Sequence, residues 1–239
     1  MLTFSPNLKI KLFADGADLT TMQEIAKKPY IKGLTTNPTL MRKAGIGDYK
    51  KFAKDVLAVI QDKPISFEVF SDNFDEMVSQ GMEIASWGTN VNVKIPVTNS
   101  QGKSTESVIN HLSNQGVSLN VTAILTTEQV TTVVQALNPN ASAFISVFAG
   151  RIADTGRDPI PLMQESLEII KAKPKTELIW ASPRELLNII QANEIGCHII
   201  TATSDILKKL DVIGKDLSQY SLETVKMFRD DALASGYSI

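Results

Sequence analysis

Short apolar runs alternate with amphipathic segments along the whole chain, and this alternation constrains the fold more than any other feature. The apolar runs begin at Leu8, Ile31, Ile65, Asn90, Ser118, Ala143, Glu177 and Cys197. The segments between them carry apolar residues at intervals of three and four, as in YKKFAKDVLAVIQ and FDEMVSQGMEIASW, which is typical of helices. Eight strands that alternate with helices predict an α/β fold, a single (β/α)8 TIM barrel over residues 1–239. A doubly wound open sheet is the alternative, and SLETVKMFRDDALAS predicts an extra helix at the carboxyl end.

Three helix-start signals support this count of units. Asn73 to Glu76, Thr126 to Gln129 and Ser182 to Glu185 each have the spacing of a capping box. The last of them also has proline at the expected first helical position. We therefore expect Ser182 to cap a helix directly after the seventh strand.

Composition excludes several classes of function. The chain has 24 basic and 26 acidic side chains, so no bulk charge favours a nucleic-acid or membrane partner. Cys197, His111 and His198 are too few for a structural zinc site, and a single cysteine forms no internal disulfide. We expect Cys197 and His198 to be packed and His111 to be exposed. The amino terminus lacks the apolar stretch of a secretory signal, which predicts a cytoplasmic protein.

Polar side chains alternate with apolar ones along three consecutive strands, within SFEVF (66–70), NVNVKIPV (90–97) and SLNVTA (118–123). The apolar faces should contact the helices, so the polar faces should point into the barrel. The inward-facing side chains nearest the strand ends are Glu68, Lys94, Asn120 and Thr122. Burial favours the neutral amine of a lysine, which can attack a carbonyl group while a carboxylate moves protons. The alternative is that Lys94 reaches out of the strand end and forms a structural ion pair with Glu68.

Two further polar residues follow the first and second strands. Asp15 precedes a glycine and Asn37 precedes a proline, so each is either a functional group or a turn former. In a functional reading, Asp15 is a general base and Asn37 donates to substrate hydroxyls. Strict alternation places Asp15 on the same side as Lys9 and Lys11, so we expect only the end of this strand to enter the barrel.

Anion-binding features follow the sixth and seventh strands. Arg151 comes directly after FISVFAG, and Arg184 lies next to the helix start expected at Ser182. A helix amino terminus and two guanidinium groups together favour a phosphate group. The alternative is that Ser182 is a helix cap and nothing more.

Taken together, these segments resemble the transaldolase family over the whole chain. The matching segments are FADGAD (13–18), GLTTNPTLM (33–41), SFEVF (66–70), NVNVKIPVT (90–98), LNVTAI (119–124), ISVFAGRIAD (145–154) and WASPRE (180–185). Each motif alone is weak, but their order and their position at strand ends are specific. The resemblance implies transfer of a dihydroxyacetone unit between sugar phosphates in the pentose phosphate pathway, without a metal or an organic cofactor. Because the family forms dimers and larger rings, it also implies a homo-oligomer.

The resemblance implies a role for each matching residue. Lys94 would form a Schiff base with the substrate, and Asp15 would be the acid and base at the hydroxyl whose deprotonation drives carbon–carbon cleavage. Glu68 and Thr122 would hold a proton-carrying water, with Asn120 beside them. The residues that would bind substrate hydroxyls and the phosphate are Asn37, Ser146, Arg151, Ser182 and Arg184.

The family also contains shorter fructose-6-phosphate aldolases, whose pattern has glutamine at the position of Glu68 and tyrosine at the position of Phe148. The resemblance implies that Phe148 also lines the substrate site. The chain length is closer to these aldolases, whereas Glu68 and Phe148 favour transfer. Pro183 and Gly16-Ala17 depart from the usual family pattern. A free aldolase that releases the three-carbon ketone is therefore the main alternative. A phosphosugar isomerase and a non-catalytic sugar-phosphate binder are two further hypotheses.

Overall fold

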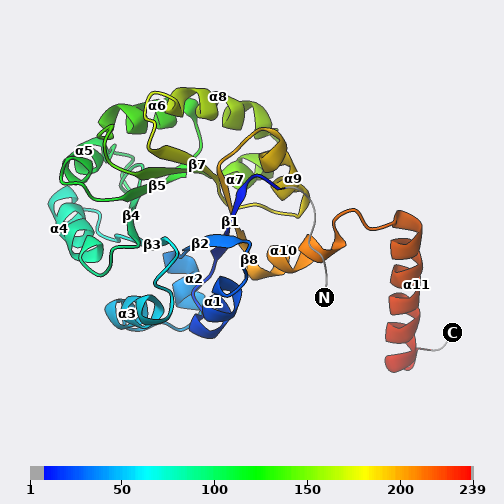
Figure 1. Ribbon diagram of the computed structural model, residues 1–239. Coiled ribbons are helices and arrows are strands. Elements are labelled where there is room, and N and C mark those ends of the chain that lie inside the picture. The colour runs from blue at the N-terminus through cyan, green and yellow to red at the C-terminus, as the bar shows by residue number, and fades with distance from the viewer. Residues whose placement is uncertain (1–7, 238–239) are drawn as a thin grey trace.

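The computed structural model describes residues 8–237 and contains a closed barrel of eight parallel strands (Figure 1). Each strand pairs with the next in chain order, and β8 pairs with β1 through Lys11 and Ile199. The predicted (β/α)8 barrel is therefore confirmed, and this closure excludes the open sheet. The strands are β1 (Lys11–Asp15), β2 (Ile31–Thr35), β3 (Ile65–Glu68), β4 (Val91–Pro96), β5 (Leu119–Ile124), β6 (Ala143–Val147), β7 (Thr176–Trp180) and β8 (Ile199–Thr203).

Helices surround these strands (Figure 1). They are α1 (Leu19–Ala26), α2 (Pro38–Lys43), α3 (Tyr49–Val59), α4 (Phe74–Ala85), α5 (Glu106–Asn114), α6 (Thr127–Ala136), α7 (Ala149–Asp154), α8 (Ile160–Ile170), α9 (Leu187–Glu194), α10 (Ser204–Leu207) and α11 (Leu217–Ala234), with a 3-10 turn at Lys208–Val212. Within the described part of the chain, no helix is long and apolar enough to span a membrane.

Two of the three capping predictions hold at the expected residues. Thr126 forms a full capping box with Gln129 at the start of α6. Asn73 caps α4, but the Glu76 carboxylate accepts from the Ser71 hydroxyl, and the Asn73 amide donates to that same hydroxyl. The reciprocal half of the box predicted at Asn73 is therefore replaced by Ser71.

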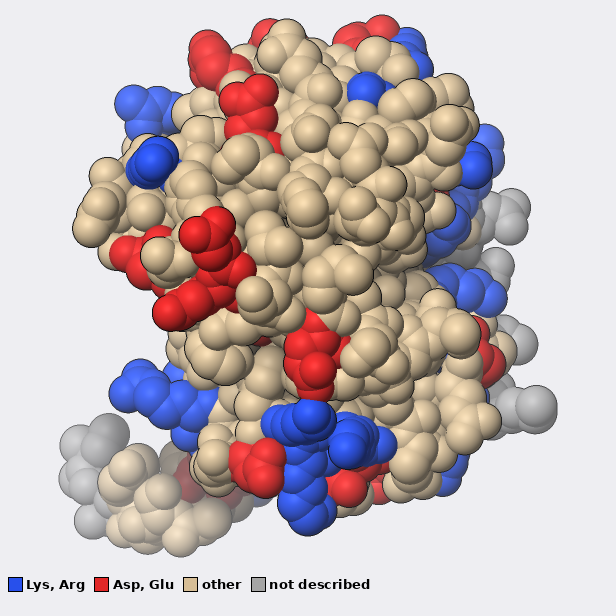
Figure 2. Space-filling view, turned by 90° about the vertical axis from the view of Figure 1, so that its left-hand side faces the viewer, with Lys and Arg blue, Asp and Glu red and all other residues tan. Residues whose placement is uncertain are grey.

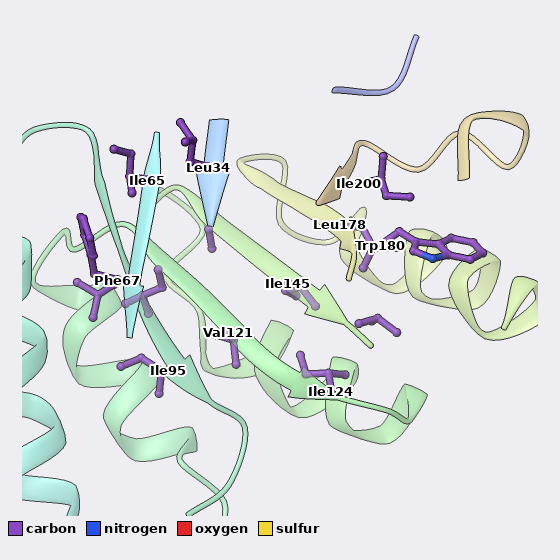
Figure 3. Close-up of a cluster of buried hydrophobic side chains, with 14 of the residues drawn as sticks. Leu34, Ile65, Phe67, Ile95, Val121, Ile124, Ile145, Leu178, Trp180 and Ile200 are labelled. Atoms are coloured by element: carbon purple, nitrogen blue, oxygen red, sulfur yellow. The ribbon is translucent and has the colours of Figure 1, made fainter. Parts of the chain in front are cut away.

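The main apolar core lies between the strands and the helices (Figure 3). It is built from the outward faces of the strands, on which alternate residues such as Ile65 and Phe67 are fully buried. Burying each such side chain stabilises the fold by about 1.5–3 kcal/mol. The labelled members are Leu34, Ile65, Phe67, Ile95, Val121, Ile124, Ile145, Leu178, Trp180 and Ile200.

A smaller apolar cluster closes the barrel interior and consists of Phe13, Ile179, Ala181 and Ile199, with Phe144 and Phe148 against it. The Phe13 ring occupies the space that a side chain on Gly33 would take, because a Cβ there would lie 2.4 Å from the ring. On the inward face of β1, Phe13 and Asp15 lie inside the barrel, as expected for the end of this strand. Lys11 lies at the exposed amino end of the strand, where its Nζ is 2.7 Å from Glu177 Oε1, and Lys9 precedes the strand.

The predicted carboxyl-terminal helix is confirmed as α11, which begins four residues before the expected segment. It stands apart from the barrel, and none of its residues is buried (Figure 1). Figure 2 shows the side of the molecule that carries α4 and α5, on which acidic and basic side chains are scattered among uncharged ones. The expectation about a secretory signal concerns mainly residues 1–7, which lie outside the described residues.

Candidate active site

A cavity of about 570 Å³ opens at the carboxyl ends of the strands. It brings together every site residue predicted from the sequence: Asp15, Asn37, Glu68, Lys94, Asn120, Thr122, Ser146, Phe148, Arg151, Ser182 and Arg184. These residues come from five strands, β1, β3, β4, β5 and β6, and from the segments that follow β2, β6 and β7. Their convergence follows from the parallel barrel, in which all carboxyl ends meet at one rim.

Lys94 lies at the centre of the charged part of this cavity. Its Nζ is 3.1 Å from Glu68 Oε2 and donates to the Thr36 carbonyl at 3.1 Å. Lys94 is only 7% exposed, so it does not reach out of the strand end as the alternative interpretation supposed. The ion pair with Glu68 exists, but it lies inside the cavity.

A hydrogen-bonded floor lies beside the lysine. Asn120 donates to Ser66 Oγ at 2.9 Å and accepts from Ser146 Oγ at 2.7 Å, which links β3, β5 and β6. Thr122 is buried, and its Oγ1 has no hydrogen-bond partner among the described residues. An unpaired buried hydroxyl is costly, so this atom is suited to bind a water or a substrate oxygen.

Asp15 faces the lysine from the opposite side of the barrel. Its Oδ1 accepts from Thr35 Oγ1 at 2.8 Å, and Asn37 Nδ2 lies 3.4 Å from its Oδ2. Burial raises the pKa of the Asp15 carboxyl above its ordinary value, although Lys94 and the Thr35 hydroxyl act to lower it. A carboxylate with a raised pKa binds protons more strongly, as a general base requires. Asn37 also caps α2 by accepting from the Leu40 amide at 3.0 Å, so it is a turn former as well as a site residue.

The prediction that Ser182 caps a helix is wrong. Ser182 has φ +60°, and α9 begins at Leu187. The side-chain oxygen Oδ1 of Asn188 accepts from the backbone amides of Arg184 and Glu185, at 2.8 and 3.2 Å. The prediction relied on local spacing alone, whereas the side chain of Asn188, four residues after Arg184, organises this loop. The helix terminus expected to bind an anion at Ser182 is therefore absent there, although Ser182 itself lines the cavity.

Both predicted arginines lie at the cavity but have partners. The Arg151 guanidinium stacks over the Phe148 ring, 5.5 Å from its centroid. Arg184 forms a two-point ion pair with Asp154 at the end of α7, with Nε 3.0 Å from Oδ1 and Nη2 in contact with Oδ2. This hydrogen bond from Arg184 lowers the pKa of the Asp154 carboxyl. The contact holds the Arg184 guanidinium at the cavity rim.

The soft metal ligands do not gather at this cavity. Cys197 is buried, which raises the pKa of its thiol to about 12, and the exposed His111 lies on α5. His198 is half-buried beside β8, where its Nδ1 accepts from the Leu178 amide at 3.2 Å. All three placements agree with the expectations. No group of three or more His, Cys, Asp or Glu side chains within residues 8–237 is placed to hold a metal ion.

Comparison with known proteins identifies the family. The profile of the transaldolase/fructose-6-phosphate aldolase family matches residues 12–238. The chain belongs to the transaldolase/fructose-6-phosphate aldolase family. A probable transaldolase of Dehalococcoides mccartyi is 34% identical over 84% of this chain and 90% of its own length. A probable transaldolase of Streptococcus agalactiae is 35% identical over 80% of this chain and 85% of its own length.

Solved structures with low sequence identity share the fold. A putative lyase/mutase from Burkholderia cenocepacia has a TM-score of 0.57 and 12% identity, and covers 95% of this chain and 87% of its own. A cube-shaped protein cage designed from fused oligomeric domains has a TM-score of 0.56 and 11% identity, over 97% of this chain and 80% of its own. At such identities, the similarity shows the barrel alone.

Sequence reasoning missed three residues in the site of this transaldolase-family chain. Thr35 and Thr201 line the cavity and contact each other, and Asp154 holds Arg184. Strand alternation offered a signal for the threonines, because Thr35 precedes Asn37 by two residues and Thr201 lies on the inward face of β8. The contact of Asp154 with Arg184 joins the end of α7 to a loop 30 residues further along the chain, and no local pattern indicates it.

The shape of the cavity wall at Ser182 depends on one glycine. A Cβ on Gly150 would lie 1.6 Å from the Ser182 carbonyl oxygen, so Gly150→Ala must displace the backbone at Ser182. We expect the free energy of unfolding to fall by about 1–3 kcal/mol in urea titrations followed by circular dichroism. Gly47→Ala is the matched control, because nothing lies within 4 Å of its Cβ position. An unchanged unfolding midpoint for Gly150→Ala would contradict this close packing.

Proposed function

We propose that the protein is a transaldolase, which transfers a dihydroxyacetone unit from a ketose phosphate to an aldose phosphate through a Schiff base on Lys94. The observation that supports this most is the buried Lys94 amine, 3.1 Å from the Glu68 carboxylate in a cavity of family-typical residues. Such a lysine is placed to attack a ketone, and such a carboxylate is placed to take its proton. We place this reaction in the cytoplasm, within carbohydrate metabolism.

The first step forms the Schiff base. Glu68 takes a proton from the Lys94 ammonium, and the neutral amine attacks the C2 carbonyl of the donor sugar. The resulting carbinolamine loses its hydroxyl as water and becomes an iminium ion. We propose that a water bound between Glu68 and Thr122 carries the protons, because the Thr122 hydroxyl is buried and unpaired among the described residues.

The second step breaks the C3–C4 bond. Asp15 removes the proton of the C4 hydroxyl, the C3–C4 electron pair moves towards the iminium nitrogen as an enamine, and the aldose phosphate leaves. Asn37 and Ser146 hold the donor hydroxyls, with Asn120 beside them. The acceptor aldose phosphate then enters, and the same steps run in reverse to release the new ketose phosphate. Because the intermediate is covalent, the kinetics are ping-pong.

The phosphate end of the substrate lies towards Arg151, Ser182 and Arg184. Asp154 already fixes Arg184 through Nε and Nη2, so its remaining guanidinium hydrogens are available to an incoming phosphate. Phe148 supports Arg151 through the ring contact at 5.5 Å. A phosphate that binds both guanidinium groups gains charge-assisted hydrogen bonds at the cavity rim.

Borohydride trapping tests the covalent step. With fructose 6-phosphate, we expect a three-carbon adduct on Lys94 alone, detected by intact-mass and peptide mass spectrometry. Lys94→Met should abolish the adduct and reduce turnover at least a thousandfold while the fold is kept. Lys51→Met, at an exposed site on α3, should change neither. Absence of any lysine adduct from the unmodified protein with bound substrate would contradict the mechanism and favour an isomerase or a binder.

The acceptor dependence separates a transaldolase from a free aldolase. Without an acceptor, we expect release of about one equivalent of aldose phosphate per Lys94, since the enamine stays on the enzyme. Addition of erythrose 4-phosphate should start steady turnover with formation of a new ketose phosphate. Steady release of dihydroxyacetone without acceptor would show that the protein is a free aldolase.

We also propose that the protein is a homo-oligomer and that α11 packs against a second copy. Leu217, Tyr220, Val225 and Phe228 are all exposed, and with 3.6 residues per turn they lie on one side of the helix. Such an apolar face on a helix that stands apart from its own barrel is typical of a protein interface.

Substitution on this helix tests the assembly. Phe228→Glu should convert the oligomer into monomers in light scattering coupled to size-exclusion chromatography, because the carboxylate would be buried in the interface. Lys226→Gln makes the same change in net charge on the opposite side of α11, and we expect it to keep the assembly. A monomeric unmodified protein, or an unchanged mass for Phe228→Glu, would refute the proposed interface.

A further inference from the structure

Two buried threonine hydroxyls extend the hydrogen bonding of Asp15 across to β8. Thr35 Oγ1 on β2 donates to Asp15 Oδ1 at 2.8 Å, and it lies 2.6 Å from Thr201 Oγ1 on β8. Thr35 is 3% exposed and Thr201 is 6% exposed. Both strands are neighbours of β1, so the two hydroxyls meet inside the barrel next to the strand that carries Asp15.

The number of protons fixes the direction of this chain. A threonine hydroxyl has one proton, and Thr35 uses its own towards the Asp15 carboxylate. Thr201 must therefore donate in the contact between the two hydroxyls. The chain runs from Thr201 to Thr35 to Asp15 Oδ1, and each hydrogen bond polarises the next.

The two oxygens of Asp15 are held unequally. Oδ1 accepts the short hydrogen bond from Thr35, whereas Oδ2 has only the longer contact of 3.4 Å with Asn37. Because Oδ1 is already bound by the Thr35 hydroxyl, Oδ2 is the oxygen left to take a proton. The chain thus fixes the rotation of the carboxylate and selects the oxygen that reacts.

We propose that Thr201, acting through Thr35, is a positioning residue that orients Asp15 and keeps it ionised for cleavage of the C3–C4 bond. This inference rests on the proposed transaldolase function. Neither threonine needs to touch the reacting atoms, because the effect passes through the hydrogen bonds to Oδ1. Removing a hydroxyl therefore alters the protonation of Asp15 while Lys94 keeps its own contacts on the other side of the cavity.

The surroundings of Asp15 determine how this effect is measured. The charged groups that face it are Lys94 on β4 and Glu68 on β3, with Lys43, Arg151 and Arg184 further out on the same cavity. Burial raises the pKa of Asp15, and the hydrogen bond from Thr35 lowers it. Loss of that hydrogen bond raises the pKa of Asp15 further. As the pH falls, the ionised carboxylate is then lost at a higher pH, so the acid limb of the pH profile of kcat moves to higher pH.

Threonine-to-valine substitutions test the proposal, because valine keeps the shape and removes the hydroxyl. For fructose 6-phosphate cleavage with an acceptor, we expect Thr35→Val to move the acid limb of kcat up by about one pH unit and Thr201→Val by about half a unit. KM should stay within about twofold and the serine variants should restore the limb, since an unpaired hydroxyl is again available. Thr176→Val is the matched control. Thr176 is a buried threonine at the amino end of β7, at the opposite end of the barrel from the cavity, and its hydroxyl has no hydrogen-bond partner among the described residues.

Borohydride trapping with dihydroxyacetone separates this inference from the function on which it rests. Dihydroxyacetone has no C4 hydroxyl, so its adduct on Lys94 does not require the proton transfer to Asp15. We expect the Thr201→Val adduct to form at the unmodified rate while cleavage is slowed several-fold at low pH. An unchanged pH profile with normal trapping, or a parallel loss of trapping and cleavage, would overturn the positioning role. Absence of the adduct from the unmodified protein would instead overturn the transaldolase mechanism.

Discussion

The structure depends on one constraint, the closure of parallel strands whose side chains alternate between two faces. Closure removes the sheet edges and places every outward face against a helix, where Phe67, Val121 and Ile145 are completely buried. The core formed there stabilises the fold without contribution from the carboxyl end of the barrel interior. That end is therefore free to hold polar groups, and all the carboxyl ends of the strands meet there.

Burying charges at this end has a cost that the neighbouring groups reduce. Lys94 and Asp15 both lie in the cavity, and burying a charged group costs free energy unless neighbouring groups compensate it. Glu68 and the Thr36 carbonyl compensate the lysine, and Thr35 compensates the aspartate. Lys94 and Asp15 also attract each other, which lowers the pKa of Asp15 against the effect of burial.

Strand periodicity made the barrel and the gathering of the site residues predictable. Alternation over two residues assigned Glu68, Lys94, Asn120 and Thr122 to one face, and the cavity contains all four. The loop at Ser182 could not be predicted in the same way, because its conformation depends on Asn188 and on close contact with Gly150. Hydrogen bonds between strands that are distant in sequence, such as that of Thr35 with Thr201, are equally absent from any local pattern.

The strained non-glycine positions of the described backbone lie at the cavity. Within residues 8–237, the non-glycine residues with positive φ are Ala123 at +62° and Ser182 at +60°, and both line the cavity. At Ala123 the pairing of β5 with β6 shifts register, directly after Thr122. A regular strand would turn residue 123 outward, so the irregularity brings a second consecutive backbone position to the cavity wall. Such strain costs about 1–3 kcal/mol per residue and persists only where the surrounding packing enforces it. The apolar layer outside the strands therefore does more than hold the barrel together, because it maintains the strained backbone that shapes the site.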